Sequence, residues 1–356
     1  MRIALITDTH WGARGDSLAF IDYFNKFYYN FFFPYLIENN ITSIVHLGDI
    51  VDRRKYINYI SLKHFRKFIN TCTENNISLD VIIGNHDTVF KNTNEVNCMK
   101  ELFSNTKYNV NYYESPTEVT FDGLPIAFLP WVCTQNYEES LKFLNDTKCQ
   151  VMFGHLEIQG FEMHKGEVCQ NGFDRSLFNK FDIVCSGHFH HKSSSNNIYY
   201  LGCPYQMNWT DYNDAKGFHI FDTDTRELQF IENPFEMFYK IHYDDTTWKD
   251  IEIMDSYNLQ QLQGTYCKII VHQKNNPYWF DMFIDKIEKV GVLDLKVVDD
   301  HLNLNLEDDN EFVNEAEDTV TIMNKVVQQM DISVDKGKLQ SFLKNLYGEA
   351  MTIEGS

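Results

Sequence analysis

The stretch Val81-Ile82-Ile83-Gly84-Asn85-His86-Asp87 places three polar side chains directly after an apolar run. An apolar run that is this short and stops at a glycine is typical of a buried strand. Open α/β sheets bind their ligands at the carboxyl ends of such strands. Because glycine and asparagine are also ordinary turn residues, the tetrapeptide alone is equally compatible with a plain turn. The rest of the chain decides between the two interpretations.

Four further apolar runs end in the same kinds of side chain. The run at residues 3–6 is followed by Asp8-Thr9-His10, and the run at 44–47 by Gly48-Asp49. The run at 151–153 is followed by Gly154-His155, and the run at 183–185 by Gly187-His188-Phe189-His190. Five strands that all end in metal-ligand types favour a common site over five unrelated turns.

The bulk composition bounds the class of protein. The chain has 356 residues and 43% hydrophobic content, enough for one large core and one or two smaller modules. Its net charge of -20 argues against wrapping nucleic acid by bulk positive potential, although a metal centre could still bind it locally as a substrate. The eight cysteines form no Cys-x-x-Cys pair, so we expect free thiols in a reducing cytoplasm. No run approaches the ~20 apolar residues of a membrane span.

The order of strands and helices predicts an α/β domain over residues 1–234. Short apolar strands alternate there with helical stretches at 17–39, 60–75, 94–103 and 135–145. Two strand pairs, 119–121 with 126–129 and 218–221 with 228–231, are separated by short turns and should be antiparallel. We therefore expect mixed rather than purely parallel sheets.

The pattern changes after Asn233-Pro234. Strands at 239–243, 266–271 and 293–298 with a helix at 277–290 predict a small α+β module over residues 235–300. Residues 301–356 then contain an acidic linker and two amphipathic helices, at about 311–330 and 333–347.

The strand-end residues suggest a ligand set for two cations. If the strand geometry persists, Asp8 and His10 point to the same side and hold one cation, to which His190 can also return. The two oxygens of Asp49 could bridge both cations. A second ion would be held by the other three ligands, Asn85, His155 and His188. Mixed imidazole, carboxylate and amide ligands suit manganese, iron or zinc better than magnesium.

The order of these motifs resembles that of the calcineurin-like metallophosphoesterases over roughly residues 1–230. The resemblance implies two mixed β-sheets flanked by helices, with a dinuclear metal centre at the strand ends that activates water for in-line attack on phosphorus. It also implies that His86, beside ligand Asn85, contacts the phosphate and assists the leaving oxygen without binding metal. The alternative for His86 is a histidine that only holds the loop.

Finer features resemble one branch of this superfamily. The stretch Asp8-Thr9-His10-Trp11-Gly12 looks like the opening of the SbcD-type DNA-repair nucleases. The segments Tyr200-Leu201-Gly202-Cys203-Pro204 and Lys216-Gly217-Phe218 are similar to those after their last metal motif. The length and the stretch from Gly48 to Lys55 look most like the phage-encoded recombination endonuclease nuclease subunits. Archaeal and eukaryotic members carry a second active-site histidine where this chain has Asp52, so that role is not carried over.

This resemblance implies a manganese-dependent DNA exonuclease or endonuclease, with Mg²⁺ as the alternative ion, in a recombination and double-strand-break repair complex. Residues 235–300 would cap the DNA, and residues 301–356 would dock a coiled-coil SbcC-type ATPase. Any ATP dependence must come from that partner, because the chain has no Gly-x-x-x-x-Gly-Lys-[Ser/Thr]. A bacterial cytoplasm is the expected location.

Two surface predictions concern the region beyond Asp49. The basic run Arg53-Arg54-Lys55 is expected to contact the phosphate backbone, although such runs are usually solvated. We also expect a homodimer through the helix at 60–72 and the loop after Asp87. Apolar surface there would come from Tyr56, Tyr59, Phe65 and Phe68, although core packing explains the two phenylalanines equally well. The aromatic residues between 20 and 33 fall at helical spacings and predict helix core rather than a base-stacking platform.

Two alternative functions stay open. The stretch Gly48-Asp49-Ile50-Val51-Asp52-Arg53 nearly reproduces the phosphoprotein phosphatase motif. However, Arg54 replaces its final glycine and Asp87 replaces its glutamate. A non-catalytic scaffold that only docks an ATPase and DNA would predict decayed ligands, yet every expected ligand type is present.

Overall fold

The structure is a computed structural model, and it describes residues 1–104, 108–164, 167–248 and 257–299, with isolated positions at 254, 327, 336, 339 and 340. The chain divides into two compact units, Met1–Asn305 and Leu306–Ser356. Except for four isolated positions, the acidic linker and the two amphipathic helices predicted beyond residue 300 lie outside the described residues.

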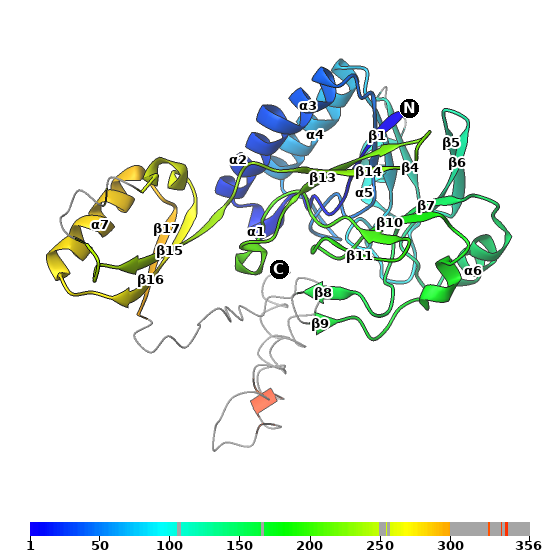
Figure 1. The fold of residues 1–356 in the computed structure, drawn as a ribbon. Coiled ribbons are helices and arrows are strands. Elements are labelled where there is room, and N and C mark those ends of the chain that lie inside the picture. Colours follow the sequence, from blue (N-terminus) through cyan, green and yellow to red (C-terminus); the bar gives the residue numbers. More distant parts are fainter. Residues whose placement is uncertain are drawn as a thin grey trace. The chain divides into compact units, whose positions relative to one another are not determined.

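Two six-stranded mixed sheets form the body of the first unit (Figure 1). The first sheet has the order β14-β13-β1-β2-β3-β4, with strands β1 (Arg2–Ile6), β2 (Ser43–His46), β3 (Ser78–Ile82), β4 (Val110–Tyr113), β13 (Gly217–Asp222) and β14 (Leu228–Glu232). The second has the order β11-β12-β10-β7-β6-β5, with strands β5 (Thr117–Phe121), β6 (Leu124–Leu129), β7 (Val151–His155), β10 (Ile183–Gly187), β11 (Ser193–Ser195) and β12 (Ile198–Tyr200). Both predicted antiparallel pairs, β5 with β6 and β13 with β14, are confirmed.

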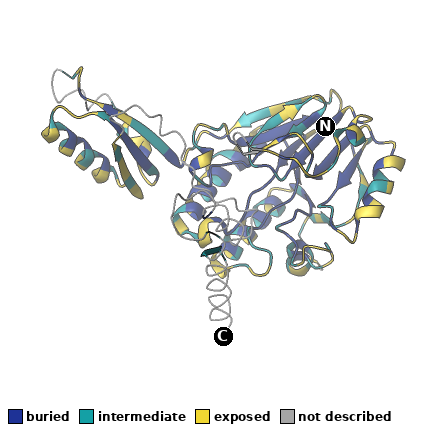
Figure 2. Cartoon of the chain, turned by 90° about the horizontal axis from the view of Figure 1, so that it is seen from below, coloured by how far each residue is buried: buried dark blue, intermediate teal, exposed yellow. Residues whose placement is uncertain are grey.

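The central strands are buried on both faces, which explains why their sequences are continuous apolar runs. In β1 alternate side chains serve two different cores. Ile3 and Leu5 pack toward the second sheet against residues such as Phe153, whereas Ala4 and Ile6 pack toward the helices. In Figure 2 the strands of these sheets are mostly dark blue, and the yellow exposed residues gather on helices and loops.

Helices cover the outer face of each sheet. The helical segments of this body are α1 (Ala13–Asp16), α2 (Leu18–Phe27), the π-helical turn η1 (Tyr28–Phe32), α3 (Phe33–Glu38), α4 (Tyr59–Glu74), α5 (Cys98–Phe103), α6 (Tyr137–Asp146) and the 3₁₀ turns η2 (Arg175–Phe178) and η3 (Trp209–Asp211). The aromatic residues of α2, η1 and α3 pack in one buried cluster with Trp11, whose ring stacks on Tyr28 at 5.3 Å. Their predicted role as helix core is confirmed.

Two predicted helices differ from the structure. The stretch 17–39 is helical but carries the π-helical turn η1 just before Pro34. The helix predicted at 94–103 begins only at Cys98, because the Asn97 side chain accepts the Lys100 N–H at 2.9 Å and so forms the N-cap. Asn94 instead lies in a loop and donates to the carbonyl oxygen of Trp131.

A small three-stranded parallel sheet follows Pro234, with its own apolar core. It consists of β15 (Phe238–Asp244), β16 (Tyr266–Gln273) and β17 (Asp294–Asp299), with the turn η5 (Leu259–Leu262) before β16 and the helix α7 (Pro277–Val290) before β17. Strands β8 (Glu162–His164) and β9 (Glu167–Val168) pair antiparallel in a two-stranded sheet of their own. The predicted strands and helix of the small module are present, whereas its assignment as a domain over residues 235–300 remains a prediction.

The fold class is confirmed: two mixed sheets flanked by helices, with a small α+β element after them. Within the part of the chain that the structure describes, no helix is long and apolar enough to cross a membrane. The predicted dimer surface changes. Phe65 and Phe68 of α4 are buried in the core and offer no surface to a second subunit.

Candidate metal centre

The carboxyl ends of five parallel strands meet at one edge of the two sheets. In the first sheet β1, β2 and β3 run parallel, and in the second β7 and β10 run parallel with His155 level with Gly187. All seven predicted ligands lie at or just after these ends. The structure therefore brings together residues that are up to 182 positions apart, as Asp8 and His190 are.

The first group contains Asp8, His10 and His190, with one candidate ligand atom of each lying within 4.8 Å of the others. The Nε2 atoms of His10 and His190 are 3.0 Å apart, and Asp8 Oδ1 lies 4.0 Å and 3.9 Å from them. Nitrogen ligands lie about 2.1 Å from a bound transition metal, so two at right angles lie about 3.0 Å apart. This arrangement fits one shared cation.

The second group contains Asp49, His155 and His188, again with ligand atoms within 4.8 Å of one another. The Asn85 side-chain oxygen joins them, 2.8 Å from His155 Nε2 and 3.0 Å from His188 Nδ1. Asp49 Oδ2 lies 3.3 Å from His155 Nε2. Because the Leu47 carbonyl can only accept, His155 Nδ1 carries the proton that it donates there at 2.8 Å, which leaves Nε2 as the ligand atom.

A third group combines His10 with two residues that were not predicted as ligands, Asp52 and His86. His10 Nδ1 is buried, lies 3.7 Å from Asp52 Oδ1 and has no hydrogen-bond partner among the described residues. The His86 ring stands edge-on to that of His10 at 4.8 Å. His86 Nδ1 donates to the Asp52 carbonyl at 2.6 Å, so this bond orients the ring and leaves Nε2 as its other nitrogen.

The backbone at the site is not the continued strand that we expected for Asp8 and His10. Strand β1 ends at Ile6, and both residues adopt positive φ, 51° and 43°, as do Asp49 and His188 with 55° and 93°. Non-glycine residues rarely adopt this region, and such residues cluster at functional sites. Main-chain bonds from Asp8 N to Gly48 O and from His10 N to Asp49 O hold the two loops in this form. The side chains converge because of the loop rather than because of strand alternation.

Two glycines of the motifs are required by close approach. A Cβ on Gly84 would lie 2.3 Å from both the amide nitrogen and Oδ1 of Asp49. A Cβ on Gly187 would lie 2.0 Å from Thr7 Oγ1 and 3.0 Å from Asp8 Oδ2. Any side chain at these positions would push a carboxylate ligand away from its group.

Asp87 supports the site and was not among the predicted site residues. Its carboxylate accepts four main-chain N–H groups, from Gly84 at 2.8 Å and from Asp49, Ile50 and Val51 at 2.9, 2.8 and 3.2 Å. One side chain thus joins the loop after β2 to the loop after β3 and fixes Asp49 between them. Its place in the Gly-Asn-His-Asp motif was the available signal, but its contacts depend on tertiary structure.

Lys216 and Trp131 also support the site, a role that was predicted for neither residue. Lys216 is buried with its ammonium 2.6 Å from Asp211 and 2.7 Å from Asp214, and it donates to the carbonyl oxygen of His190 at 2.9 Å. The ring of Trp131 lies 5.0 Å from that of His188. The tryptophan follows the end of strand β6 by two residues, which is the one signal that could have marked it.

The electrostatics of the site fit a cation. Burial lowers the pKa of His10 and of His188 to about 3, so both imidazoles are neutral, as metal ligation requires. Burial and the nearby Asp49 charge raise the pKa of Asp8 to about 7, although the charge of His155 opposes this. The ion pairs between described residues that involve Asp8 and Asp49 are made with histidines alone. A buried carboxylate set of this kind gains most from a positive ion placed among its oxygens.

The three residues of the predicted basic run have different surroundings. Arg53 pairs with Asp16 at 2.8 Å, and its guanidinium lies over the ring of Tyr56. Lys55 is exposed. Arg54 is half-buried, and its Nη1 atom has no hydrogen-bond partner among the described residues. Burial lowers the pKa of the Arg54 guanidinium, and the negative charges of Asp49 and Asp87 oppose that change. Arg54 therefore lies close enough to interact electrostatically with Asp49 of the second ligand group.

Comparison with known proteins is consistent with this geometry. A model of the calcineurin-like phosphoesterase family matches residues 1–192. Exonuclease subunit 1 of Enterobacteria phage T4 is 34% identical over 320 residues, which cover 89% of this chain and 90% of that protein. The SbcD-type subunit of nuclease SbcCD from Staphylococcus epidermidis is 25% identical over 263 residues, which cover 64% of this chain and 67% of that protein.

Solved structures that match this chain include a dimetal phosphatase from Danio rerio and a hypothetical protein from Thermus thermophilus. The first has 12% identity and a TM-score of 0.38 and covers 62% of this chain and 91% of its own. The second has 14% identity and a TM-score of 0.36 and covers 66% of this chain and 100% of its own.

The carboxylate of Asp87 should be essential for stability. Asp87→Ala leaves four buried main-chain N–H groups without their acceptor, so we expect the free energy of unfolding to fall by at least ~3 kcal/mol. Asp87→Asn retains one acceptor oxygen and should lose less. Urea unfolding with a chelator present measures both variants independently of bound metal. Equal stability of Asp87→Ala and the unchanged chain would contradict the role of Asp87.

Asp49 should be essential for holding both ions, because two neighbouring cations repel each other unless a shared carboxylate lies between them. We expect Asp49→Ala to lose most of the bound manganese, measured by elemental analysis after dialysis. The matched variant Asp52→Ala, which removes a neighbouring carboxylate, should retain it. Substantial one-ion occupancy with activity in Asp49→Ala would rule out the bridging role.

Proposed function

This chain belongs to the calcineurin-like phosphoesterase family, and from that premise we propose that it is the nuclease subunit of a DNA recombination and repair complex. The observation that carries the proposal is the convergence of seven residues of metal-binding types, from five strand ends, into two adjacent groups. Its relatives named as an exonuclease subunit and a nuclease subunit support DNA as the substrate. The reaction is hydrolysis of a phosphodiester bond.

The family and the two ligand groups indicate divalent metal ions as cofactors. We assign one ion to Asp8, His10 and His190 and the other to the second group, with Asp49 between them. When bound, such ions activate a water nucleophile and neutralise charge on the phosphate. The mixture of imidazole, carboxylate and amide ligands favours Mn²⁺, with Mg²⁺ as the weaker candidate.

Two side chains complete the reaction site. The Asp52 carbonyl orients the His86 ring by accepting from its Nδ1. His86 Nε2 then holds a proton at the oxygen that leaves phosphorus. Arg54 has a buried N–H group available to a phosphate oxygen, and the geometry of guanidinium groups suits such oxygens. Of the predicted basic run, Arg54 is therefore the candidate for contact near the scissile phosphate, whereas Arg53 and Lys55 suit more distant backbone contacts.

The second candidate function is a phosphoprotein phosphatase, favoured by the motif from Gly48 to Arg53. The phosphatase motif has a glutamate where this chain has Asp87. The Asp87 carboxylate accepts four main-chain N–H groups here, so this departure from the phosphatase motif is part of the site's structure. A non-catalytic scaffold is disfavoured by the intact ligand groups. Such a scaffold has no use for buried imidazoles that are kept neutral, as those of His10 and His188 are, one in each ligand group.

The partners are proposed from the relatives and from the sequence. The relative named as one subunit of nuclease SbcCD implies a second type of subunit, and we propose a coiled-coil ATPase docked by residues 301–356. The module at 235–300 is assigned to cap DNA, and the complex to the cytoplasm of a bacterial host. A homodimer would use the exposed Tyr56, Tyr59, Ile60 and Phe90 in place of the buried phenylalanines.

One experiment separates the three functions. The purified chain with manganese is incubated with end-labelled DNA or with a phosphopeptide. Release of nucleotides or shortened DNA without phosphate release from the peptide supports the nuclease. The reverse result would establish the phosphatase, and inactivity toward both substrates with metal bound would favour the scaffold.

His86 should be needed for the reaction but not for metal binding. We expect His86→Ala to reduce DNA cleavage by about 10²- to 10⁴-fold, because a proton-transferring group contributes that much. Manganese content should stay near that of the unchanged chain, because His86 is assigned no ligand role. An empty metal site in this variant would show that His86 is a ligand, together with His10 and Asp52 of the third group, and would contradict our assignment.

Residues beyond about Asp309 should dock the ATPase rather than complete the nuclease. Apolar residues recur there at three- and four-residue steps, and two short helices on an acidic tether would bury little surface alone. A chain that ends near Asp309 should keep manganese-dependent nuclease activity and lose co-purification with the ATPase. Loss of folding or of metal binding on truncation would place these helices in the catalytic core instead.

A further inference from the structure

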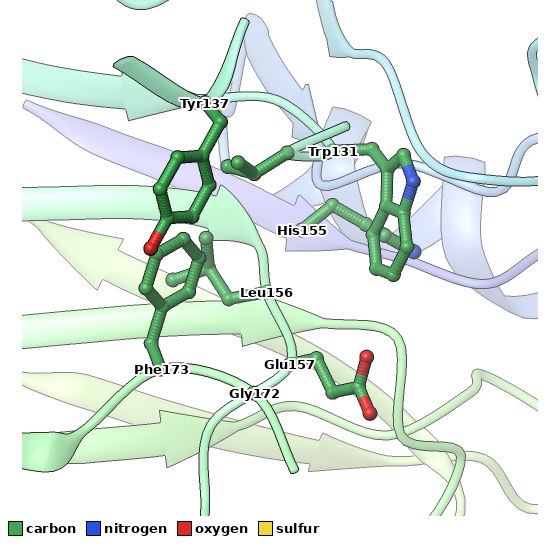
Figure 3. Close-up of a pocket in the computed structure, with 8 residues that line it drawn as sticks. Trp131, Tyr137, His155, Leu156, Glu157, Gly172 and Phe173 are labelled. Atoms are coloured by element: carbon green, nitrogen blue, oxygen red, sulfur yellow. The ribbon is translucent and has the colours of Figure 1, made fainter. Parts of the chain in front are cut away.

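A pocket with no role in the proposed reaction lies directly beside the metal centre. Its volume is about 230 Å³, and its walls include Trp131, Tyr137, His155, Leu156, Glu157 and Phe173. His155 belongs both to this pocket and to the second ligand group, so the pocket and the centre share a wall. Figure 3 shows Trp131 beside His155 on one side of the pocket, with Tyr137 and Phe173 on the other.

Four of the eight residues that line the pocket carry aromatic rings. The Trp131 ring lies 5.0 Å from the ring of His188 and 6.1 Å from that of His155. The rings of Tyr137 and Phe173 are parallel to within 5°, with their centres 6.4 Å apart. Leu156 is buried and adds an aliphatic side chain to the lining. Aromatic walls of this kind favour a flat, unsaturated ligand.

Trp131 is held in a fixed position. Its main-chain N–H donates to the carbonyl oxygen of Ile83, at the end of strand β3, at 2.8 Å. Its own carbonyl oxygen accepts from the buried side chains of Asn94 at 2.7 Å and Asn136 at 3.0 Å. The wall is therefore formed before any ligand binds, which reduces the entropy that binding would cost.

The opposite wall is tied to the chain that follows strand β7. Phe173 N donates to the carbonyl oxygen of Glu157, and Gln159 N donates to that of Phe173. Gly172 permits this approach, because a Cβ there would lie 2.4 Å from the Glu157 carbonyl oxygen and its φ is +98°. The Glu157 carboxylate lies near Trp131 in Figure 3. It offers an acceptor to a ligand with an N–H group on its edge.

We propose that this pocket is a subsite for one unpaired nucleobase of the strand that is cut, beside the scissile phosphate. The inference rests on the proposed nuclease function. A nucleotide carries its base and its phosphate on one sugar, which matches a flat aromatic pocket that shares His155 with a phosphate-binding centre. The volume is below the range of about 300–1,000 Å³ for drug-sized ligands, so it suits one ring system and not a base pair.

The proposal has a consequence for the DNA that is cut. A base inside a duplex must leave its stack to enter such a pocket, at a cost that is least when the base is already unpaired. Aromatic stacking then returns part of that cost regardless of sequence, because every base has a flat face. The chain should therefore cut single-stranded or frayed DNA ends in preference to a closed duplex.

The test pairs a change in the protein with a change in the DNA. Short single strands, either intact or with one abasic residue at a scissile position, are cut by the unchanged chain and by Tyr137→Ala and Phe173→Ala. For the unchanged chain we expect the missing base to reduce kcat/KM about tenfold, as stacking interactions of this kind predict. In the two variants the abasic strand should be cut nearly as well as the intact one. Ile37→Ala, which removes an exposed apolar side chain of α3, should behave like the unchanged chain.

The controls keep the outcomes distinct. An abasic penalty that is absent from the unchanged chain, or equally large in the variants, would overturn the subsite. If the unchanged chain cuts no DNA, the proposed nuclease function fails instead. Binding of a nucleotide to the pocket then tests whether the base subsite exists. For that measurement the fluorescence of 2-aminopurine deoxyribonucleoside monophosphate is titrated with each protein. Saturable quenching that is lost in Tyr137→Ala and Phe173→Ala supports the pocket, and identical curves for all proteins refute it.

Discussion

The carboxylate of Asp87 is the constraint on which the site depends. It is buried and accepts N–H groups from two loops that follow neighbouring strands. It makes three of the bonds that join the loop carrying Asp49 to the loop carrying Asn85. His86 adds two more, from its main-chain N–H to Asp49 Oδ1 and from its ring to the Asp52 carbonyl. A buried charge is costly unless it is fully hydrogen-bonded. That requirement fixes the four main-chain N–H groups that Asp87 accepts, and with them the loops that carry Asp49 and Asn85.

The surrounding fold supplies rigidity at the same edge. Strands β1, β2, β3, β7 and β10 are buried on both faces, so their carboxyl ends cannot move independently of the two sheets. Gly84 and Gly187 let carboxylates approach the backbone closely. Four of the proposed ligands have positive φ, so the loops hold conformations that they would not adopt alone. The same strand ends support Trp131 through Ile83. The proposed base subsite and metal centre are thus positioned by one framework.

The fold class and the membership of the site could be predicted from the sequence, because short apolar runs ending in ligand types repeat five times. The detailed geometry could not. Asp8 and His10 were expected to meet through strand alternation, but they meet through left-handed turns that depend on bonds to the Gly48-Asp49 loop. The roles of Asp87 and Lys216 depend on main-chain partners that are brought close only by folding. Phe65 illustrates the ambiguity of a helical stripe, because its spacing predicts burial and surface contact equally.

If the strand ends hold two cations with Asp49 between them, anomalous scattering from a crystal of the chain soaked in manganese will reveal both. We expect two neighbouring peaks, one among Asp8, His10 and His190 and the other among Asn85, His155 and His188, with Asp49 contacting both. A single peak among His10, Asp52 and His86, or no peak at this edge of the sheets, would contradict this expectation.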